Sequence, residues 1–171
     1  MRLFVAINLN EATRSALASL QEELRESAIR GRFSTRENLH LTLAFLGECD
    51  SIQTAAACAA MDAQSFAPFS LEINRLGCFR REGGEIWWAG AVASEPLLAL
   101  QQDLAKSLRA AGFRLEERQF RPHITLAREV VAPEKERTVP PFSETVTRID
   151  LMKSERIGGK LMYTAIHSIQ S

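Results

Sequence analysis

The chain has 171 residues, of which 46% are hydrophobic and 25% are charged; this composition favours one soluble globular domain and excludes a disordered or fibrous protein. Its 21 basic residues balance its 21 acidic residues, so an extended nucleic-acid footprint is disfavoured, whereas a nucleic-acid end or a single nucleotide remains a permitted partner. Three cysteines, Cys49, Cys58 and Cys78, form no CxxC pair, and an odd number of cysteines cannot close a disulfide framework, which favours the reducing cytoplasm.

The N-terminal half begins with a strand pattern. The run LFVAINL at 3–9 is rich in β-branched and aromatic residues, and no small-residue cleavage site follows it, so it indicates a first strand and not a signal peptide. No run approaches the roughly 18 apolar residues of a membrane span, and we expect no membrane partner. The pattern then predicts a helix over 11–26, a breaker near Gly31, a strand over 39–47, an alanine-rich helix over 51–66 and a strand over 69–79.

The order of elements then begins again, after a turn at the paired glycines of RREGGE. Ser94 is predicted to cap the helix of this half, with Pro96 in its first turn. The charged, proline-containing segment 129–141 predicts a loop where a further helix would be expected. The pattern predicts strands over 85–92, 123–128, 142–155 and 161–169, and a helix over 95–112.

The repeated order indicates a diverged internal repeat, approximately 1–80 and 84–155, within one domain that spans 1–171. Two copies are too few for a solenoid array, so we expect them to pack as two lobes related by an approximate two-fold axis. Such an axis would bring equivalent positions of the two halves face to face.

Nearly identical motifs occupy equivalent places in the two halves: HLTLAFLG begins at His40, and HITLAR begins at His123. Because side chains alternate along a strand, His40 and Thr42 share one face while the intervening aliphatic residues point the other way, and His123 and Thr125 repeat this arrangement. A single His-x-Thr on a strand is most often only part of that strand. Two of the chain's three histidines at the same place in divergent halves instead favour a functional pair.

Two imidazoles and two hydroxyls in one cleft suit chemistry at phosphorus. One neutral imidazole would take a proton from the attacking oxygen, while one imidazolium would give a proton to the departing oxygen. In-line displacement needs these groups on opposite sides, which a two-fold pair supplies. The alternative is metal binding by the two imidazoles, but metal sites generally need three or four protein ligands, and neither motif has a third histidine or an HxxxE spacing.

A fixed guanidinium would further stabilise a phosphate or its transition state. Strict alternation along the strand places Arg121 on the histidine face and Arg128 off it, unless the strand bends. An exposed surface position is the alternative for both of these arginines, and Arg36 is a weaker third candidate. Phe4 and Phe45 lie near a motif strand or its expected neighbour, but a core position is a more common role for such residues than stacking on a base.

Trp87 and Trp88 are adjacent in a predicted strand, so they point to opposite faces and at most one faces the core. The other is a candidate to flank the cleft. His167 lies alone in the last predicted strand without a partner motif, and we interpret it as structural.

The paired motifs HLTL and HITL resemble the signature of the two-histidine (2H) phosphoesterase superfamily. The surrounding NLHLTLAFLG and RPHITLAR, with the RLFVAINL start, look most like the bacterial and archaeal RNA 2′,3′-cyclic phosphodiesterases, also called 2′-5′ RNA ligases. The likeness covers nearly the whole chain. It implies a bilobal α+β fold with two antiparallel sheets in a pseudo-two-fold arrangement, helices outside and a central cleft, and no metal or nucleotide cofactor.

The resemblance also implies a reaction and roles for the residues. Water would open a terminal ribose 2′,3′-cyclic phosphate to the 2′-phosphomonoester, with the 3′ oxygen leaving. By that analogy His40 is the proton donor and His123 the proton acceptor, and the phosphate is bound by Thr42, Thr125 and Arg128. A 5′-hydroxyl attacking the cyclic phosphate would give ATP-independent 2′-5′ RNA ligation. We expect a cytoplasmic monomer whose partner is RNA or a nucleotide with a terminal 2′,3′-cyclic phosphate.

Two other functions are compatible with the same residues. A sister activity would act on another cyclic phosphate or on a 2′-5′ linkage, such as ADP-ribose cyclic phosphate or 2′-5′ oligoadenylate. A noncatalytic module would use the histidines only to hold the phosphate at an RNA 3′ end. Product formation distinguishes this second function from the enzymes, and relative rates on the different substrates distinguish the enzymes from one another.

Overall fold

The computed structural model describes residues 1–133 and 135–171. Within these residues the chain forms one α+β structure, as predicted. Its elements, in chain order, are β1 (Arg2–Asn8), α1 (Glu11–Ser27), β2 (Arg30–Phe33), the short 3₁₀ helix η1 (Arg36–Asn38), β3 (His40–Glu48), α2 (Ser51–Asp62), β4 (Phe69–Phe79), β5 (Glu85–Ala91), α3 (Glu95–Ala110), β6 (His123–Val131), β7 (Arg137–Val146), β8 (Arg148–Ile157) and β9 (Lys160–Gln170).

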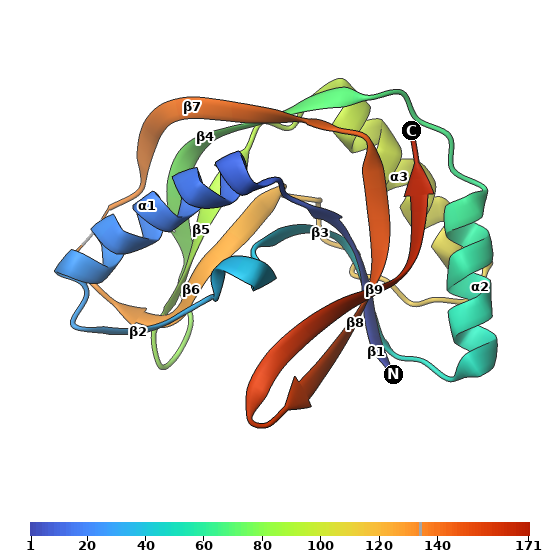
Figure 1. Ribbon diagram of the computed structural model, residues 1–171, viewed down its shortest axis with the longest axis horizontal. Coiled ribbons are helices and arrows are strands. Elements are labelled where there is room, and N and C mark those ends of the chain that lie inside the picture. Colours follow the sequence, from blue (N-terminus) through green and yellow to red (C-terminus); the bar gives the residue numbers. More distant parts are fainter. Residues whose placement is uncertain (134) are drawn as a thin grey trace.

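The strands form two antiparallel groups that meet in the middle of the molecule (Figure 1). One group has the order β7-β4-β5-β6 and the other has the order β3-β1-β8-β9. β3 and β6 join the two groups, and these strands pair at a single position, Leu41 with Ile124. The two predicted sheets are therefore continuous at a narrow junction, and this junction holds the first residues of both histidine motifs.

Each strand group takes strands from both halves of the sequence. β4, from the first half, pairs with β5 of the second half, while β8, from the second half, pairs with β1 of the first. The chain crosses between the groups more than once, for example between β3 and β4 and again at Thr147, between β7 and β8. Contiguous halves of the sequence therefore do not correspond to separate groups of strands, and the internal repeat itself stays a prediction.

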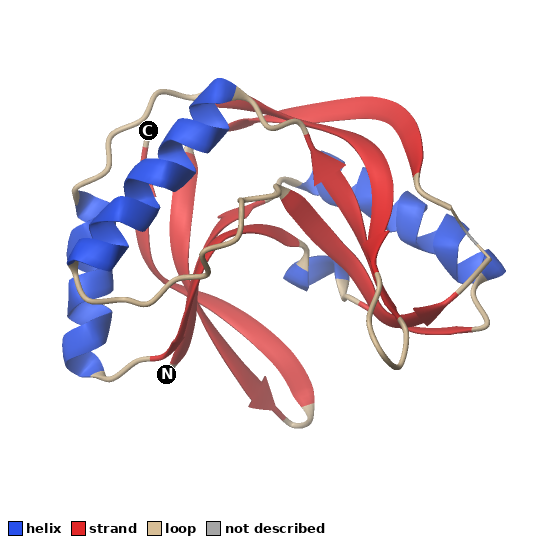
Figure 2. Cartoon of the chain, turned by 180° about the vertical axis from the view of Figure 1, so that it is seen from behind, coloured by secondary structure: helices blue, strands red, loops and turns tan. Residues whose placement is uncertain are grey.

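The helices lie outside the strands (Figure 2). α1 packs near β2, β6 and β7, while α2 and α3 pack against each other and against strands that include β3 and β9. Local chemistry fixes where they begin: the Asn10 side chain accepts a hydrogen bond from the Thr13 amide, and Asp50 and Gln53 form a reciprocal capping box. Ser94 is the N-cap of α3, as predicted, although its hydroxyl makes no capping hydrogen bond.

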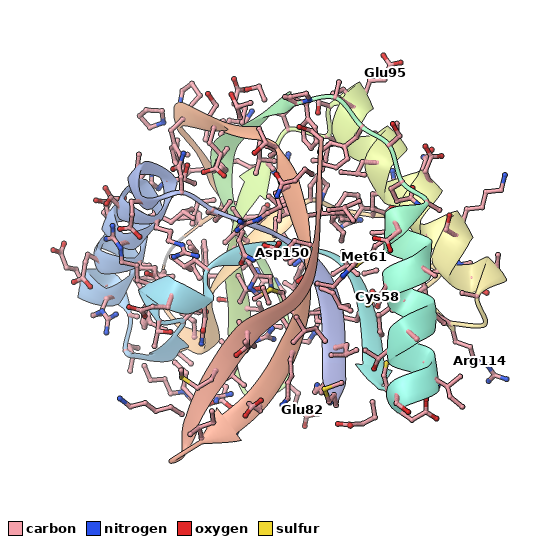
Figure 3. The ribbon with its side chains drawn as sticks, turned by 45° about the vertical axis from the view of Figure 1, so that its right-hand side comes forward. Cys58, Met61, Glu82, Glu95, Arg114 and Asp150 are labelled. Carbon is pink, nitrogen blue, oxygen red and sulfur yellow. The ribbon has the colours of Figure 1, made fainter. Side chains whose placement is uncertain are left out.

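A continuous hydrophobic core lies between the strands and the helices. Met61 is fully buried on α2, and Cys58 of the same helix packs against the core; both point from the helix toward the strands (Figure 3). A second, small cluster of Phe4, Ala6 and Met152 lies apart from this main core. β1 is therefore covered on both faces, which explains why its sequence is apolar almost throughout and does not alternate.

The structure differs from the sequence prediction at several segments. The predicted loop 129–141 is shorter, because β6 continues to Val131 and β7 begins at Arg137; Glu134 lies outside the described residues. The predicted strand 142–155 is two strands, β7 and β8, in different groups. The alanine-rich helix ends at Asp62, earlier than predicted, and the strand β2 was not predicted.

Candidate active site

The two histidine motifs meet at the junction of β3 and β6. Because Leu41 pairs with Ile124 in an antiparallel register, the residues on either side of this pair face their counterparts on the other strand. The aliphatic residues of the pair are fully buried, whereas the four polar residues around them are partly exposed on the opposite face. The structure thus brings together, on one face, the predicted residues His40, Thr42, His123 and Thr125.

The His40 ring is held by two hydrogen bonds. Its Nδ1 lies 2.7 Å from the carbonyl oxygen of Asn38, and its Nε2 lies 2.9 Å from the Thr42 hydroxyl. A carbonyl oxygen can only accept, so Nδ1–H donates, and in the neutral ring Nε2 is left to accept from Thr42. The nitrogen nearer the threonine is therefore the one available to exchange a proton with a ligand.

The His123 ring repeats this arrangement in the other motif. Its Nδ1 lies 2.6 Å from the carbonyl oxygen of Arg121, which is again the residue two positions earlier. The same tautomer is therefore selected in both rings, with Nδ1 as donor to the backbone. The two repeated motifs therefore hold the ring proton on the same nitrogen, Nδ1.

Aromatic rings pack against each imidazole. His40 contacts Phe4, with ring centroids 4.8 Å apart, and Tyr163, with centroids 5.2 Å apart and ring planes nearly perpendicular. His123 contacts Phe79 in the same perpendicular way at 5.2 Å, and Trp88 at 6.2 Å. These contacts restrict the orientation of both rings and remove part of their hydration.

The electrostatic environment lowers the pKa of both histidines. Burial lowers the pKa of His40 from its ordinary value of 6.5, the hydrogen bond to the backbone raises it, and the charges of Arg128 and His123 lower it again. Burial is also the main cause that lowers the pKa of His123; its backbone hydrogen bond opposes this, Arg128 lowers the pKa further, and Glu116 raises it. Arg128 therefore acts on both imidazoles, and the charge of His123 also acts on His40.

Arg128 reaches the histidine face because β6 contains a β-bulge. The register between β5 and β6 shifts by one residue at Leu126, and both Leu126 and Ala127 are buried. An extra residue in a strand reverses the alternation beyond it. Strict alternation had placed Arg128 off the histidine face, and this expectation is wrong because the strand is not regular there.

The first motif has the same bulge at the equivalent place. The register between β1 and β3 shifts at Leu43, and Leu43 and Ala44 are both buried. Phe45 then occupies the position that corresponds to Arg128 and is 63% exposed, so it is not a core residue. The two lobes thus place different chemistry at equivalent points: a guanidinium on one strand and an aromatic ring on the other.

The other two candidate arginines have separate positions. Arg121 precedes β6; its carbonyl oxygen orients His123, and its side chain lines a cavity beside that ring. Arg36 is engaged elsewhere, since its guanidinium hydrogen-bonds to the Glu11 carboxylate at 2.9 Å and to the Ser15 hydroxyl. The structure does not bring Arg36 to the histidines through these contacts.

Tyr163 is a residue of this site that the motifs did not reveal. It lies on β9 and contacts both His40 and Phe4. Burial raises the pKa of its hydroxyl, while Arg128, Arg2 and Arg156 lower it. Positive charge therefore surrounds the His40 side of the site. Tyr163 is the chain's one tyrosine, but it lies outside both motifs, so the motif pattern gave no signal for it.

The remaining candidates divide between core and site. Trp87 is fully buried, whereas Trp88 points the other way and contacts His123, which matches the predicted division of the two faces. Phe4 is buried and contacts His40. The Nε2 of His167 lies 2.7 Å from the Asp62 carboxylate, so this histidine links β9 to the end of α2 and not to the other two histidines.

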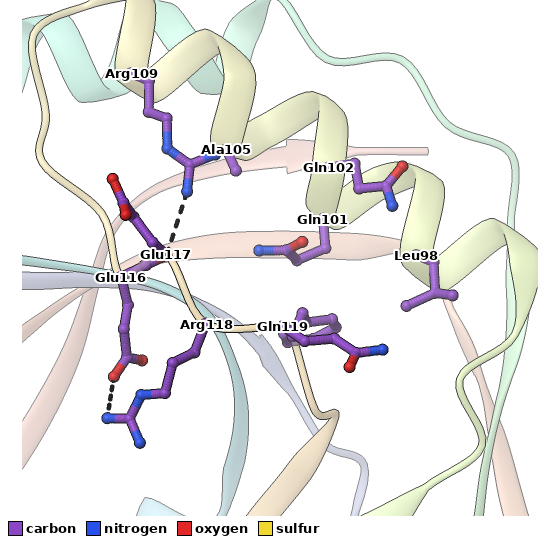
Figure 4. A pocket seen from close by; sticks show the side chains of 10 residues that line it. Leu98, Gln101, Gln102, Ala105, Arg109, Glu116, Glu117, Arg118 and Gln119 are labelled. Carbon is purple, nitrogen blue, oxygen red and sulfur yellow. Dashed lines mark hydrogen bonds and ion pairs between the residues drawn. The ribbon is translucent and has the colours of Figure 1, made fainter.

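Two hollows flank the segment that leads into β6. The first, of about 350 Å³, lies between α3 and residues 116–120; Arg109 donates to the Glu116 carbonyl, and the Glu116 carboxylate pairs with Arg118 (Figure 4). The second, of about 340 Å³, is lined by His123. Only the second of these two hollows has a motif histidine in its wall.

Among the described residues, no group of three or more His, Cys, Asp or Glu side chains is arranged to hold a metal ion. The polar groups of the site are instead imidazoles, hydroxyls and one guanidinium. These are proton carriers and donors to an anion. No helix within residues 1–133 and 135–171 is long and apolar enough to cross a membrane.

Comparison with known proteins gives a consistent result. Residues 6–158 match the family described as the 2′-5′ RNA ligase superfamily. A protein of Thermotoga maritima called RNA 2′,3′-cyclic phosphodiesterase is 30% identical in an alignment that covers 99% of this chain and 95% of that protein. An Escherichia coli protein of the same name is 29% identical over 96% of this chain and 93% of its own length.

Solved structures agree over nearly the whole chain. The crystal structure of Escherichia coli LigT complexed with 3′-AMP matches with a TM-score of 0.85 at 29% identity, covering 99% of this chain and 97% of that one. A crystal structure from Thermus thermophilus matches with a TM-score of 0.82 at 31% identity and the same coverage. The arrangement of strands and helices described above is therefore that of these proteins.

Proposed function

Because the chain belongs to the 2′-5′ RNA ligase superfamily and is an enzyme of the cyclic phosphodiesterase type, we propose that it opens RNA-terminal 2′,3′-cyclic phosphates to 2′-phosphomonoesters by metal-independent acid-base catalysis with His40 and His123. The observation that carries the proposal is the pairing at the junction of β3 and β6. Two His-x-Thr motifs meet there on one face, each with its Nδ1 fixed by a backbone carbonyl and its Nε2 left for proton exchange.

The proposed reaction is an in-line displacement at phosphorus. His123, as the neutral base, takes a proton from water as the oxygen of that water bonds to phosphorus. The bond from phosphorus to the 3′ oxygen breaks, and His40, as the imidazolium, gives its proton to that oxygen. The product carries the phosphate on the 2′ oxygen and a free 3′-hydroxyl. Each turnover leaves His123 protonated and His40 neutral, and exchange with solvent restores both.

Thr42, Thr125 and Arg128 are the proposed phosphate-binding residues. Thr42 already lies within hydrogen-bonding distance of His40 Nε2, so turning its hydroxyl toward a bound phosphate would free that nitrogen for the leaving oxygen. Arg128 lowers the pKa of both histidines, which supports a place for its charge near both rings. A fixed guanidinium there would stabilise charge on the nonbridging oxygens.

The proposed substrate is an RNA or nucleotide end, bound by a monomer. The balanced overall charge supports a short footprint, because the basic and acidic side chains are equal in number. The three cysteines are free, which supports a cytoplasmic location. With a 5′-hydroxyl in place of water, the same two histidines would catalyse ATP-independent 2′-5′ ligation.

The experiment that tests this function is incubation of the purified protein with an oligoribonucleotide ending in a 2′,3′-cyclic phosphate, with and without EDTA. We expect a 2′-phosphomonoester in both conditions. A 3′-phosphomonoester would reverse the assignment of the leaving oxygen, and saturable binding without product would favour a noncatalytic end-binding module. Faster turnover of ADP-ribose cyclic phosphate or of 2′-5′ oligoadenylate would identify a sister activity.

The pH dependence of hydrolysis follows from the histidine environments. The active form has His40 protonated and His123 neutral, and the pKa of each is lowered from 6.5 in the free protein. Activity is lost at low pH as His123 gains a proton and at high pH as His40 loses one, so kcat/KM should be bell-shaped with its maximum below pH 6.5. A kcat/KM that still rises well above this pH would contradict the assignment.

A bound anionic phosphate favours the protonated imidazoles, so the profile of kcat, which reports the enzyme–substrate complex, should lie at higher pH than that of kcat/KM. Initial rates on a 2′,3′-cyclic nucleotide across the pH range measure both profiles. Coincident profiles would mean that the phosphate does not contact the titrating rings.

A further inference from the structure

The two sides of the candidate active site differ in shape. The cavity of about 340 Å³ is lined by residues of β4, β5 and the segment that leads into β6, including His123. Its lining includes neither His40 nor Tyr163. A hollow of this size is at the lower end of the range of about 300–1,000 Å³ for small-molecule sites, so it suits one nucleoside and not a longer strand.

One wall of this cavity is an aromatic platform in which the partly exposed ring of Phe79 is backed by the ring of Trp88, which is only 9% exposed. The rings of Phe79 and Trp88 lie 5.4 Å apart between centroids, and both contact His123. Two glycines leave room for the platform: a Cβ at Gly77 would lie 2.4 Å from the Trp88 ring, and a Cβ at Gly90 would lie 2.9 Å from it. An exposed aromatic face can stack on any nucleobase, and the ring with exposed area here is that of Phe79.

The cavity is lined by both positively and negatively charged side chains. The Arg75 guanidinium lies 5.5 Å from the centroid of the Trp88 ring, and Arg121 also lines the cavity. Glu136 lines it as well, and its carboxylate accepts a hydrogen bond from the Cys78 amide at 3.2 Å. This mixture suits a neutral nucleoside with polar edges better than a run of phosphates.

The reaction needs such a cavity on this side only when the attacker is larger than water. The leaving 3′ oxygen belongs to the ribose of the cyclic phosphate, which must therefore reach His40. The attacking oxygen must reach His123 from the opposite direction. Water needs no cavity, whereas a 5′-hydroxyl brings its nucleoside with it.

We propose that the cavity beside His123 binds the 5′-terminal nucleoside of an RNA strand that attacks the cyclic phosphate in 2′-5′ ligation. This inference rests on the proposed roles of the two histidines. The 5′ O–H bond breaks and His123 takes the proton; the 5′ oxygen bonds to phosphorus; the bond to the 3′ oxygen breaks; and His40 protonates that oxygen. The products are a 2′-5′ phosphodiester and a 3′-hydroxyl, without any further reactant.

The test measures ligation and hydrolysis in one reaction. The donor is an oligoribonucleotide ending in a 2′,3′-cyclic phosphate, and the acceptor carries a 5′-hydroxyl. The ratio of ligated to hydrolysed donor is independent of how much enzyme is folded. Ala93→Trp is designed to fill the cavity, Arg75→Ala removes a charge from its wall, and Ala55→Trp is the matched control on the exposed side of α2.

We expect the ratio to fall by about tenfold in Ala93→Trp and by a smaller factor in Arg75→Ala, because each disturbs the stacking of one base. Ala55→Trp should keep the ratio of the unmodified protein. An acceptor without a base on its 5′-terminal nucleotide should lower the ratio in the unmodified protein and change it little in Ala93→Trp.

Several results would overturn the inference. An unchanged ratio in both cavity variants would show that the acceptor does not use this cavity. A raised KM for hydrolysis with an unchanged ratio would show that the cavity holds the donor. Hydrolysis without any ligation by the unmodified protein would refute the inference and leave the proposed function standing, whereas the absence of both products would refute both.

Discussion

His40→Ala and His123→Ala should each lower kcat for hydrolysis of a 2′,3′-cyclic nucleotide by about 10²–10⁴-fold, the usual contribution of one general acid or base. Both rings lie on the partly exposed face of the junction strands, and the apolar residues between the motif positions, not the imidazoles, form the core. The variants should therefore fold. Steady-state kinetics at the pH optimum of the unmodified protein measure the loss, and circular dichroism checks the fold.

His167→Ala is the matched control for these variants. This third histidine binds Asp62 at the end of α2, and within the described part of the chain it makes no hydrogen bond or ring contact with the motif histidines. Its replacement should leave kcat within about twofold, since surface changes away from a site have small effects. Full activity in either motif variant, or an equal loss in the control, would contradict the proposed roles.

Trp87→Ala should lower the free energy of unfolding by about 3–5 kcal/mol, the usual cost of truncating a buried tryptophan. The side chain is fully buried on β5, directly beside the motif strand β6, where its partner is Ala127. For a chain of this length the loss corresponds to about 6–20 °C in Tm. Urea denaturation and calorimetry measure it.

Phe45→Ala is the control for the effect of burial. Its ring is aromatic too but 63% exposed, so its removal should change the free energy of unfolding by less than about 0.5 kcal/mol. Equal destabilisation by the two variants would mean that Trp87 does not carry the core contacts that its position indicates.

The sequence predicts most of this site because the histidine motif is local and repeated. His40 and Thr42 are two residues apart on one strand, so alternation alone places them on one face, and the second motif repeats the argument. Ser94 and the strand at residues 3–9 could be predicted for the same reason: each depends on chemistry within a few positions. The roles of these residues came from the resemblance to a known family and await the experiments above.

Features that depend on distant pairing could not be predicted. The bulges at Leu43 and Leu126 are defined by the register with β1 and β5, which a single strand does not disclose, and they decide that Arg128 faces the histidines. Tyr163 on β9 contacts His40, and Phe79 on β4 contacts His123. These contacts form only because each group of strands combines strands from both halves of the sequence.

The most direct test of the central claim uses a donor in which sulfur replaces the 3′ oxygen of the cyclic phosphate. A thiolate leaves without being protonated, because a thiol is far more acidic than an alcohol. If His40 is the acid and His123 the base, His40→Ala should hydrolyse this donor at nearly the rate of the unmodified protein, while His123→Ala should stay slow. Equal impairment of both variants, or recovery of His123→Ala alone, would contradict the account.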